Sequence, residues 1–242
     1  MFRNPNLPGI LVRTVIWVAV TVAITMLLSL GLAELYNQRF PGRRFARWAI
    51  IAPWAASVMM TALIFRWMLQ PENGVVNVFL HQLGVVHQYN SNQADWLGRP
   101  DSAFVWMIGV AVFVSLPFTT YVLLAGLQTI PGEVYEAARV DGASGARAYR
   151  TITLPLLRPA LLVAAVLNLI YVFNSFPIVW TLNDRNPGFA HDTMITYMYK
   201  IAFKSALRDV GLAAALGVVN VGLILLAVVA YLRVARWREE PV

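Results

Sequence analysis

Six side chains that could bind a polar solute lie within one otherwise apolar stretch, near residues 161–180. They are Asn168, Tyr171, Asn174, Ser175, Phe176 and Trp180. Amide and phenol groups can hydrogen-bond the hydroxyl groups of a sugar, and aromatic rings can cover a sugar's C–H surface. Because a polar group that faces lipid is costly, we predict that this face lines a solute pathway inside a helix bundle. Alternatively, Asn168 and Asn174 hydrogen-bond neighbouring helices, and the aromatic rings face lipid or the core.

Other kinds of chemistry find little support in the sequence. No nucleophile–base pair or metal cluster can be assembled, so we expect neither catalytic residues nor a metal site. His81, His87 and His191 lie outside the long apolar runs and show no i, i+4 spacing. No glycine begins a G-x-x-x-x-G-K-[ST] loop, so we expect no nucleotide or other cofactor on this chain. The apolar runs also lack the buried acidic or histidine relays of a proton-driven carrier.

Composition indicates a protein that crosses a membrane several times. Of the 242 residues, 59% are hydrophobic and 13% are charged, whereas charged residues make up about 25% of a soluble domain. The net charge of +7 could suggest a nucleic-acid partner, but no basic stripe with interleaved aromatic residues is present. Basic residues instead lie mostly beside the ends of apolar runs, where anionic lipid headgroups favour them. Cysteine is absent, which excludes disulfides and thiolate chemistry.

Five apolar runs are long enough to cross a hydrocarbon core, which requires about 20 helical residues. They lie near residues 10–32, 49–69, 104–125, 161–180 and 210–232. Neither an internal repeat nor a low-complexity segment divides the chain. We therefore expect one all-α domain over residues 1–242, a polytopic membrane helical bundle.

Arginine residues near the ends of these runs predict the orientation of the bundle. Three basic segments fall on one side if the runs alternate in direction. Their arginines are Arg39, Arg43, Arg44 and Arg47, then Arg139, Arg147, Arg150 and Arg158, and finally Arg233, Arg236 and Arg238. We therefore expect this side, which includes the C-terminus, to be cytoplasmic.

The polar segment at residues 131–159 separates two of the apolar runs. Pro131 and Glu133 suit the start of a helix, where a missing N–H and a negative charge cost least. Gly142 predicts the end of that helix, because glycine enters the left-handed C′ conformation freely. Ser144 can then cap a second short helix before the chain returns to the membrane.

This segment resembles the EAA loop of permease subunits of ATP-binding-cassette (ABC) importers. The resemblance rests on Glu136-Ala137-Ala138, Gly142, Ile152, Leu154 and Pro155, which have the spacing of that motif. It implies a cytoplasmic loop, residues 131–159, whose helix docks into a cleft on a separate ATPase subunit. The implied docking residues are Tyr135, Glu136, Ala137, Ala138, Asp141, Gly142, Ile152, Leu154 and Pro155, with Val140 as a further apolar contact. The alternative is an amphipathic loop that only turns the chain between two spans.

Segments on the opposite side carry weaker resemblances to the same family. Gly74-Val75-Val76-Asn77 resembles its G-x-[IV]-N turn, and Trp96-Leu97 resembles a tryptophan–leucine pair that leads back to the membrane. For both, the alternative is an interfacial loop with an aromatic anchor. A later loop departs from the family's T-x-G-G-P-x-x-x-T pattern, because Pro187 and Thr193 fit but both glycines are replaced.

The resemblance is strongest to the sugar permeases related to the maltose system. It implies a type I ABC importer transmembrane domain in the inner (cytoplasmic) membrane, with the first core span expected to be missing. The implied partners are a second homologous permease, two ATPase subunits that bind ATP and Mg²⁺, an extracytoplasmic solute-binding protein and membrane lipid, but no nucleic acid. The implied solute is a carbohydrate, with glycerol phosphate or a polyol as a variant. The alternative function is a self-sufficient secondary transporter or channel for small polar solutes.

Overall fold

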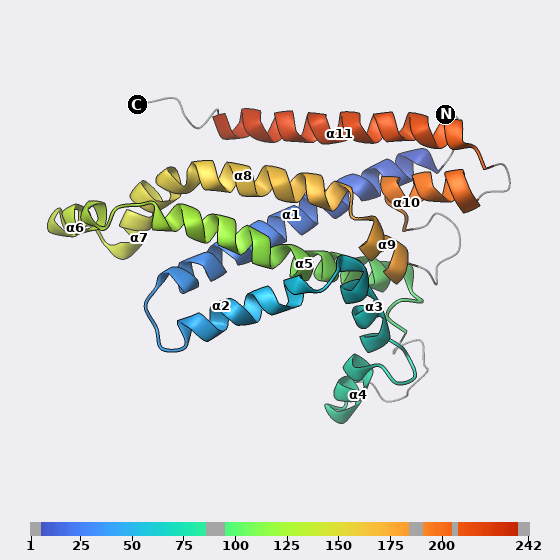
Figure 1. Ribbon diagram of the computed structural model, residues 1–242, viewed down its shortest axis with the longest axis horizontal. Helices are drawn as coiled ribbons and strands as arrows, with labels where there is room; N and C mark the ends of the chain where they lie inside the picture. Colours follow the sequence, from blue (N-terminus) through green and yellow to red (C-terminus); the bar gives the residue numbers. More distant parts are fainter. Residues whose placement is uncertain (1–5, 86–94, 184–190, 205–207, 237–242) are drawn as a thin grey trace.

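The computed structural model describes residues 6–85, 95–183, 191–204 and 208–236, and every regular element in these ranges is helical. His87, Pro187 and Arg238, which the sequence analysis named, lie outside the described residues. Long helices run roughly along the long axis of the molecule, and short helices gather at both ends (Figure 1). The described part of the chain is thus the all-α bundle that the sequence predicts.

Four helices in the described ranges are long and apolar enough to cross a membrane. They are α1 (Leu7–Asn37), α5 (Pro100–Gln128), α8 (Leu154–Phe173) and α11 (Val210–Arg236). The first two pack along one another, and α8 contacts both. The indole N–H of Trp17, a fully buried residue on α1, donates to the carbonyl of Val172 on α8 over 3.1 Å. This bond joins two helices that are far apart in the sequence.

The expected span at residues 49–69 is not one continuous helix. The chain here forms α2 (Arg43–Ile51), a 3₁₀ turn (Ala52–Ala55) and α3 (Val58–Met68). Pro53 explains the break, because it has no N–H to donate and its ring crowds the preceding turn. Ser57 then starts the new helix, since its side chain accepts the Met60 N–H over 3.2 Å.

The expected span at residues 161–180 is divided as well. α8 ends at Phe173, and α9 (Phe176–Leu182) begins after two intervening residues and packs against α3. Proline at position 177 is well placed in the first turn of a helix but could not continue α8, because it lacks the required N–H. The polar side chains predicted to line a solute pathway therefore straddle a break between two helices.

The short helices cluster at the two ends of the bundle (Figure 1). α6 (Gly132–Val140) and α7 (Gly145–Ala148) lie at one end, towards which the connection from α1 to α2 and the last turn of α11 also point. α3, α4 (Val75–Gln82), α9 and α10 (Met194–Tyr199) lie towards the other. This arrangement agrees with the expectation that the three arginine-rich segments share one side.

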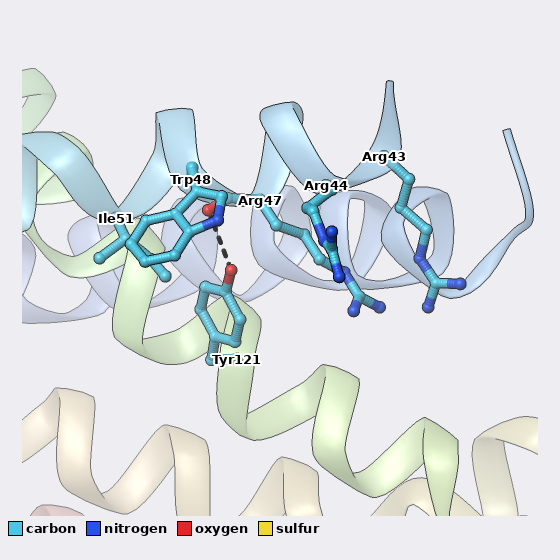
Figure 2. A pocket seen from close by; sticks show the side chains of 6 residues that line it. All are labelled: Arg43, Arg44, Arg47, Trp48, Ile51 and Tyr121. Carbon is cyan, nitrogen blue, oxygen red and sulfur yellow. Dashed lines mark hydrogen bonds between the residues drawn. The ribbon is translucent and has the colours of Figure 1, made fainter. Parts of the chain in front are cut away.

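α2 is fixed against the bundle by backbone-directed hydrogen bonds. The hydroxyl of Tyr121, on α5, donates to the Arg47 carbonyl over 2.9 Å (Figure 2). The Arg47 guanidinium in turn donates to the Tyr36 carbonyl over 2.9 Å, and the Tyr36 hydroxyl donates to the Ala46 carbonyl over 3.3 Å. α2 is thereby held at the end of the bundle that carries α6.

Two sequence motifs at the opposite end form one structure. Asn77 is completely buried, and its side-chain oxygen accepts the indole N–H of Trp96 over 2.7 Å. Its amide donates to the Gln70 carbonyl over 2.9 Å. A Cβ at Gly74 would lie 2.5 Å from the carbonyl oxygens of Met68 and Gln70, so this turn has no room for a side chain. The motifs at residues 74–77 and 96–97 thus lock the α3–α4 turn to the start of α5.

Candidate functional site

The loop between α5 and α8 has the geometry that its sequence predicts. Pro131 is the N-cap of α6, and Glu133 lies in the first turn. Gly142 has φ +75°, and the N–H of Ala143 donates to the Ala138 carbonyl over 2.9 Å. This closing bond is that of a Schellman motif, which requires a left-handed residue at the position that Gly142 occupies. The predicted end of α6 is confirmed.

A second short helix follows, and it merges with the next span. The Ser144 side chain accepts the Arg147 N–H over 3.4 Å, which confirms the predicted cap. No break separates this short helix from the span that follows it, however. A π-helical turn (Tyr149–Thr153) connects α7 to α8, so residues 145–173 form one apolar rod. The loop is therefore rigidly connected to the bundle rather than hinged at its C-terminal side.

The predicted docking residues separate into exposed residues and residues that hold the loop. Glu136, Ala137, Asp141 and Gly142 are exposed on α6 and at its end, beside Val140, which is 88% exposed. The other predicted residues are buried or half-buried: Tyr135, Ala138, Ile152, Leu154 and Pro155.

One of these inner contacts was not predicted. The Tyr135 hydroxyl lies 2.9 Å from the hydroxyl of Thr153, which is buried where the π turn meets α8. This hydrogen bond braces α6 against the rod that follows it. The sequence offered only a weak signal for Thr153, because a threonine between Ile152 and Leu154 reads as an ordinary part of an apolar helix.

The predicted solute-pathway residues do not share one environment. Asn168 and Ser175 are buried, and neither the Asn168 amide nor the Ser175 hydroxyl has a hydrogen-bond partner among the described residues. Tyr171 and Asn174 are exposed on the outside of the bundle, and the Asn174 amide donates to the Ile170 carbonyl of its own helix over 2.9 Å. In the described part of the chain, neither asparagine therefore hydrogen-bonds a neighbouring helix, in contrast to the alternative hypothesis.

Further buried polar groups that have no hydrogen-bond partner in the described part of the chain line the inside of the bundle. They are the side-chain oxygens of Thr21 and Thr25 on α1, Ser115 and Thr120 on α5, and Asn220 on α11. Buried polar groups normally have partners, so several unpaired ones in one bundle point to a polar interior. The sequence analysis missed these residues. The spacing of Thr14, Thr21, Thr25 and Ser29, which places them on one helix face, was the available signal.

Phe176 and Trp180 belong to an aromatic cluster with residues of another helix. Their rings stack with centroids 5.5 Å apart, and the Tyr199 ring lies 4.9 Å from Phe176 and 4.8 Å from Trp180. Phe203 extends the cluster, with its ring 5.1 Å from that of Tyr199. An apolar groove of about 420 Å³ lies beside it, between α10 and the start of α11. Tertiary packing thus brings together aromatic residues that precede and follow residues 184–190 in the sequence.

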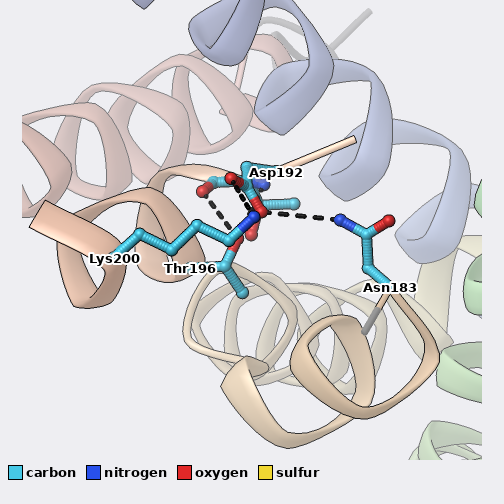
Figure 3. Close-up of polar contacts among 5 residues, drawn as sticks. Asn183, Asp192, Thr196 and Lys200 are labelled. Carbon is cyan, nitrogen blue, oxygen red and sulfur yellow. Dashed lines mark hydrogen bonds and ion pairs between the residues drawn. The ribbon is translucent and has the colours of Figure 1, made fainter. Parts of the chain in front are cut away.

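A buried ion pair beside this cluster connects the end of α9 to the residues around α10 (Figure 3). Asp192 is 1% exposed, and its carboxylate lies 2.8 Å from the Lys200 ammonium. The Asn183 amide, at the end of α9, donates to the same carboxylate over 3.5 Å. Thr193 and Thr196 close a capping box at the start of α10. Because Lys200 directly follows Tyr199, these contacts set the position of the aromatic ring.

His191 makes the same region sensitive to acid. Burial lowers the pKa of His191 below its ordinary value of 6.5, the nearby Arg13 lowers it further, and Asp101 and Asp192 oppose the shift. Because the folded state binds this proton less well than the unfolded state does, stability is complete above pH 6.5 and is lost as the pH falls below that value. We expect the midpoint of thermal unfolding to fall more steeply with acidification in the wild type than in His191→Gln. Unfolding curves between about pH 5 and 8 measure this, and identical slopes would contradict it.

These features define a class of protein. A bundle of membrane-length helices with a polar interior, and with a rigid exposed helix projecting from one end, is the membrane-embedded subunit of a transport system. The chain belongs to the family of binding-protein-dependent transport system inner membrane components, whose family model matches residues 25–239. It is therefore an integral membrane transport component, and in ABC importers of this kind ATP hydrolysis is carried out by a separate subunit. The resemblance to ABC importer permeases is confirmed.

Individual relatives cover nearly the whole chain. A probable ABC transporter permease protein of Brucella suis biovar 1 is 38% identical over 99% of this chain and 81% of its own length. The trehalose/maltose transport system permease protein MalF of Thermococcus litoralis is 36% identical, over 94% of this chain and 74% of its own. The sulfoquinovosyl glycerol transport system permease protein SmoG of Agrobacterium fabrum is 33% identical, over 99% and 75%.

A solved structure has the same fold. A chain in the crystal structure of a bacterial ABC transporter that imports the acidic polysaccharide alginate matches with a TM-score of 0.85 at 23% identity. The match covers 99% of this chain and 82% of that one. The predicted fold class, an ABC importer transmembrane domain, is confirmed.

Proposed function

We propose that this chain is a permease subunit of an ATP-driven carbohydrate importer and that α6 is its coupling helix. The observation that carries this proposal is the exposed tip of α6, braced on a rod that continues without a break into α8. A partner ATPase that closes on nucleotide would push this tip and move the spans as a rigid body between two access states. The printed names of the relatives, which include transporters of trehalose or maltose, sulfoquinovosyl glycerol and diacetylchitobiose, support carbohydrate as the solute class.

The proposed assembly contains a second homologous permease, two ATPase subunits that bind ATP and Mg²⁺, and an extracytoplasmic solute-binding protein. A related structure holds an alginate transporter together with a periplasmic protein bound to an alginate pentasaccharide, which supports the last of these partners. Val163, Leu167 and Tyr171 form an exposed apolar stripe on α8, against which a second membrane subunit or lipid would pack.

Cysteine labelling tests the proposed docking and orientation directly, because the natural chain contains no cysteine. We expect Val140→Cys to cross-link to the ATPase subunit in the assembled transporter and to react with a membrane-impermeant maleimide only from the cytoplasmic side. Val85→Cys is the matched control, since Val85 is 61% exposed and its N–H donates to the Leu80 carbonyl of α4, which lies at the opposite end of the bundle. It should not cross-link to the ATPase and should react only from outside. Labelling of Val140→Cys from outside would overturn both the coupling role and the cytoplasmic C-terminus.

The solute pathway is proposed to run past Asn168 and Ser175 and to end at the aromatic cluster. Asn168→Ala should lower uptake of the carried sugar about two- to tenfold, the worth of one hydrogen bond, without lowering the stability of the subunit. Asn174→Ala is the control, because that exposed amide is bonded to its own helix. Uptake and thermal unfolding are measured on the same preparations. Loss of stability without loss of uptake in Asn168→Ala would identify a structural asparagine instead.

A further inference from the structure

A basic pocket lies between α2 and α5 at the end of the bundle that carries α6. Its volume is about 380 Å³. The lining residues are Arg43, Arg44, Arg47, Trp48, Ile51 and Tyr121. Figure 2 shows the three arginine side chains directed towards the same side of α2. The three positive charges lie close together on α2 and repel each other, so the pocket favours a bound anion.

The chain does not neutralise these charges within the described residues. Arg43, Arg44 and Arg47 form no salt bridge there, and the Nε atoms of Arg43 and Arg47 are buried without a hydrogen-bond partner. One guanidinium donor of Arg47 is bonded to the Tyr36 carbonyl, and this bond fixes the side chain without supplying negative charge. Guanidinium groups bind phosphate through paired N–H donors, which fits the donors left unused here.

The depth of the pocket matches that of lipid headgroups. α5 contains 29 residues and is therefore about 43 Å long, close to the thickness of a bilayer with its headgroups, about 40–45 Å. Tyr121 lies seven residues before Gln128, the last residue of that helix, which corresponds to about 10 Å. The pocket therefore opens near the boundary between headgroups and hydrocarbon, where tyrosine and arginine side chains are favoured.

The same helix exposes apolar surface beside the charges. Phe45 and Trp48 on α2 are 79% and 67% exposed, although they sit among the arginines. Aromatic residues at this depth, beside a basic cluster, are favoured where a membrane protein meets the headgroup region. A free phosphate ion would use the arginines alone, whereas a phospholipid would also cover the aromatic surface.

We infer that this pocket binds the phosphate of an anionic phospholipid, such as phosphatidylglycerol, in the leaflet that faces α6. Arg43, Arg44 and Arg47 hold the phosphate, and Phe45 and Trp48 lie against the glycerol and acyl region. The bound lipid fixes α2 beside the coupling end of the bundle.

Native mass spectrometry of the purified full-length chain tests this inference, with dioctanoyl phosphatidylglycerol, dioctanoyl phosphatidylcholine and inorganic phosphate as probes. We expect the phosphatidylglycerol to bind, and the triple variant Arg43→Gln, Arg44→Gln, Arg47→Gln to bind it at least about tenfold more weakly. The corresponding triple lysine variant should bind phosphatidylglycerol with intermediate affinity, because it keeps the charge but lacks the paired N–H donors of a guanidinium group. Circular dichroism establishes that each variant is folded.

The matched control is Arg139→Gln, Arg147→Gln, Arg150→Gln, which removes the same charge from exposed positions near α6. It should bind phosphatidylglycerol as the wild type does. Equal weakening in both triple variants, or equal binding of phosphatidylcholine, would overturn the inference by showing non-specific attraction. Inorganic phosphate that binds as tightly as the lipid would overturn it in favour of a soluble anion.

Discussion

Reversing the charge at Glu136 or adding a methyl group at Gly142 should abolish most ATP-driven uptake while leaving the chain in the membrane. Glu136→Lys changes the charge on the exposed face of α6 that we propose docks into the ATPase. Gly142→Ala places a Cβ on a residue with φ +75°, which costs about 1–2 kcal/mol and tilts the end of α6. We expect at least about a tenfold loss of uptake in each variant, which corresponds to a loss of coupling free energy within the range typical of coupled sites. Uptake into proteoliposomes with the assembled transporter measures it.

Two nearby substitutions serve as controls for this prediction. Gly145→Ala adds the same methyl group three residues later, where φ is not positive. Apart from its own helix, no atom of the described residues would lie within 4 Å of the added Cβ. Glu133→Lys makes the same charge change one turn earlier, outside the proposed docking residues. Both should keep most of the uptake. Wild-type uptake in Glu136→Lys and Gly142→Ala would exclude a coupling role for α6, and uptake without any ATPase subunit would favour a self-sufficient carrier.

Removing the carboxylate of Asp192 should destabilise the region of α9 and α10 by about 2–4 kcal/mol. Breaking a buried ion pair by removing one partner leaves the other charge uncompensated, and the partial exposure of Lys200 moderates this cost. The Asn183 amide also loses its acceptor. We therefore expect Asp192→Ala to lower the midpoint of thermal unfolding and to separate Tyr199 from Trp180, which lowers sugar uptake as well.

A double variant distinguishes the ion pair from simple loss of packing. Asp192→Ala combined with Lys200→Ala should be less destabilised than the sum of the two single variants, because neither charge is then left alone. Lys204→Ala is the control for loss of a lysine from the same π-helical turn, where Lys204 is exposed. Additive effects of Asp192→Ala and Lys200→Ala would show that the pair does not stabilise the region.

Much of the coupling loop was accessible from the sequence, because its determinants are local. Gly142 ends α6 through its own backbone conformation. Ser144 caps α7 because its side chain accepts the N–H of the residue three positions later. Which of the predicted solute-pathway residues are buried and which are exposed could not be predicted from such local patterns. Asn168 and Tyr171 are three residues apart on one helix, and only the packing of other helices, including α1, α5 and α11, against α8 decides that the first is buried and the second exposed.

The sequence by itself determined the class of protein, the approximate positions of the long helices and the ends of the short helix that we propose as the coupling helix. Those properties follow from hydrophobic length, from helix caps and from residues spaced within one turn of each other. The tertiary structure decided that Asn77 meets Trp96, that Asp192 meets Lys200 and that three arginines converge beside Tyr121. These contacts join segments whose relative positions depend on how whole helices pack, and no local pattern of residue types encodes that packing.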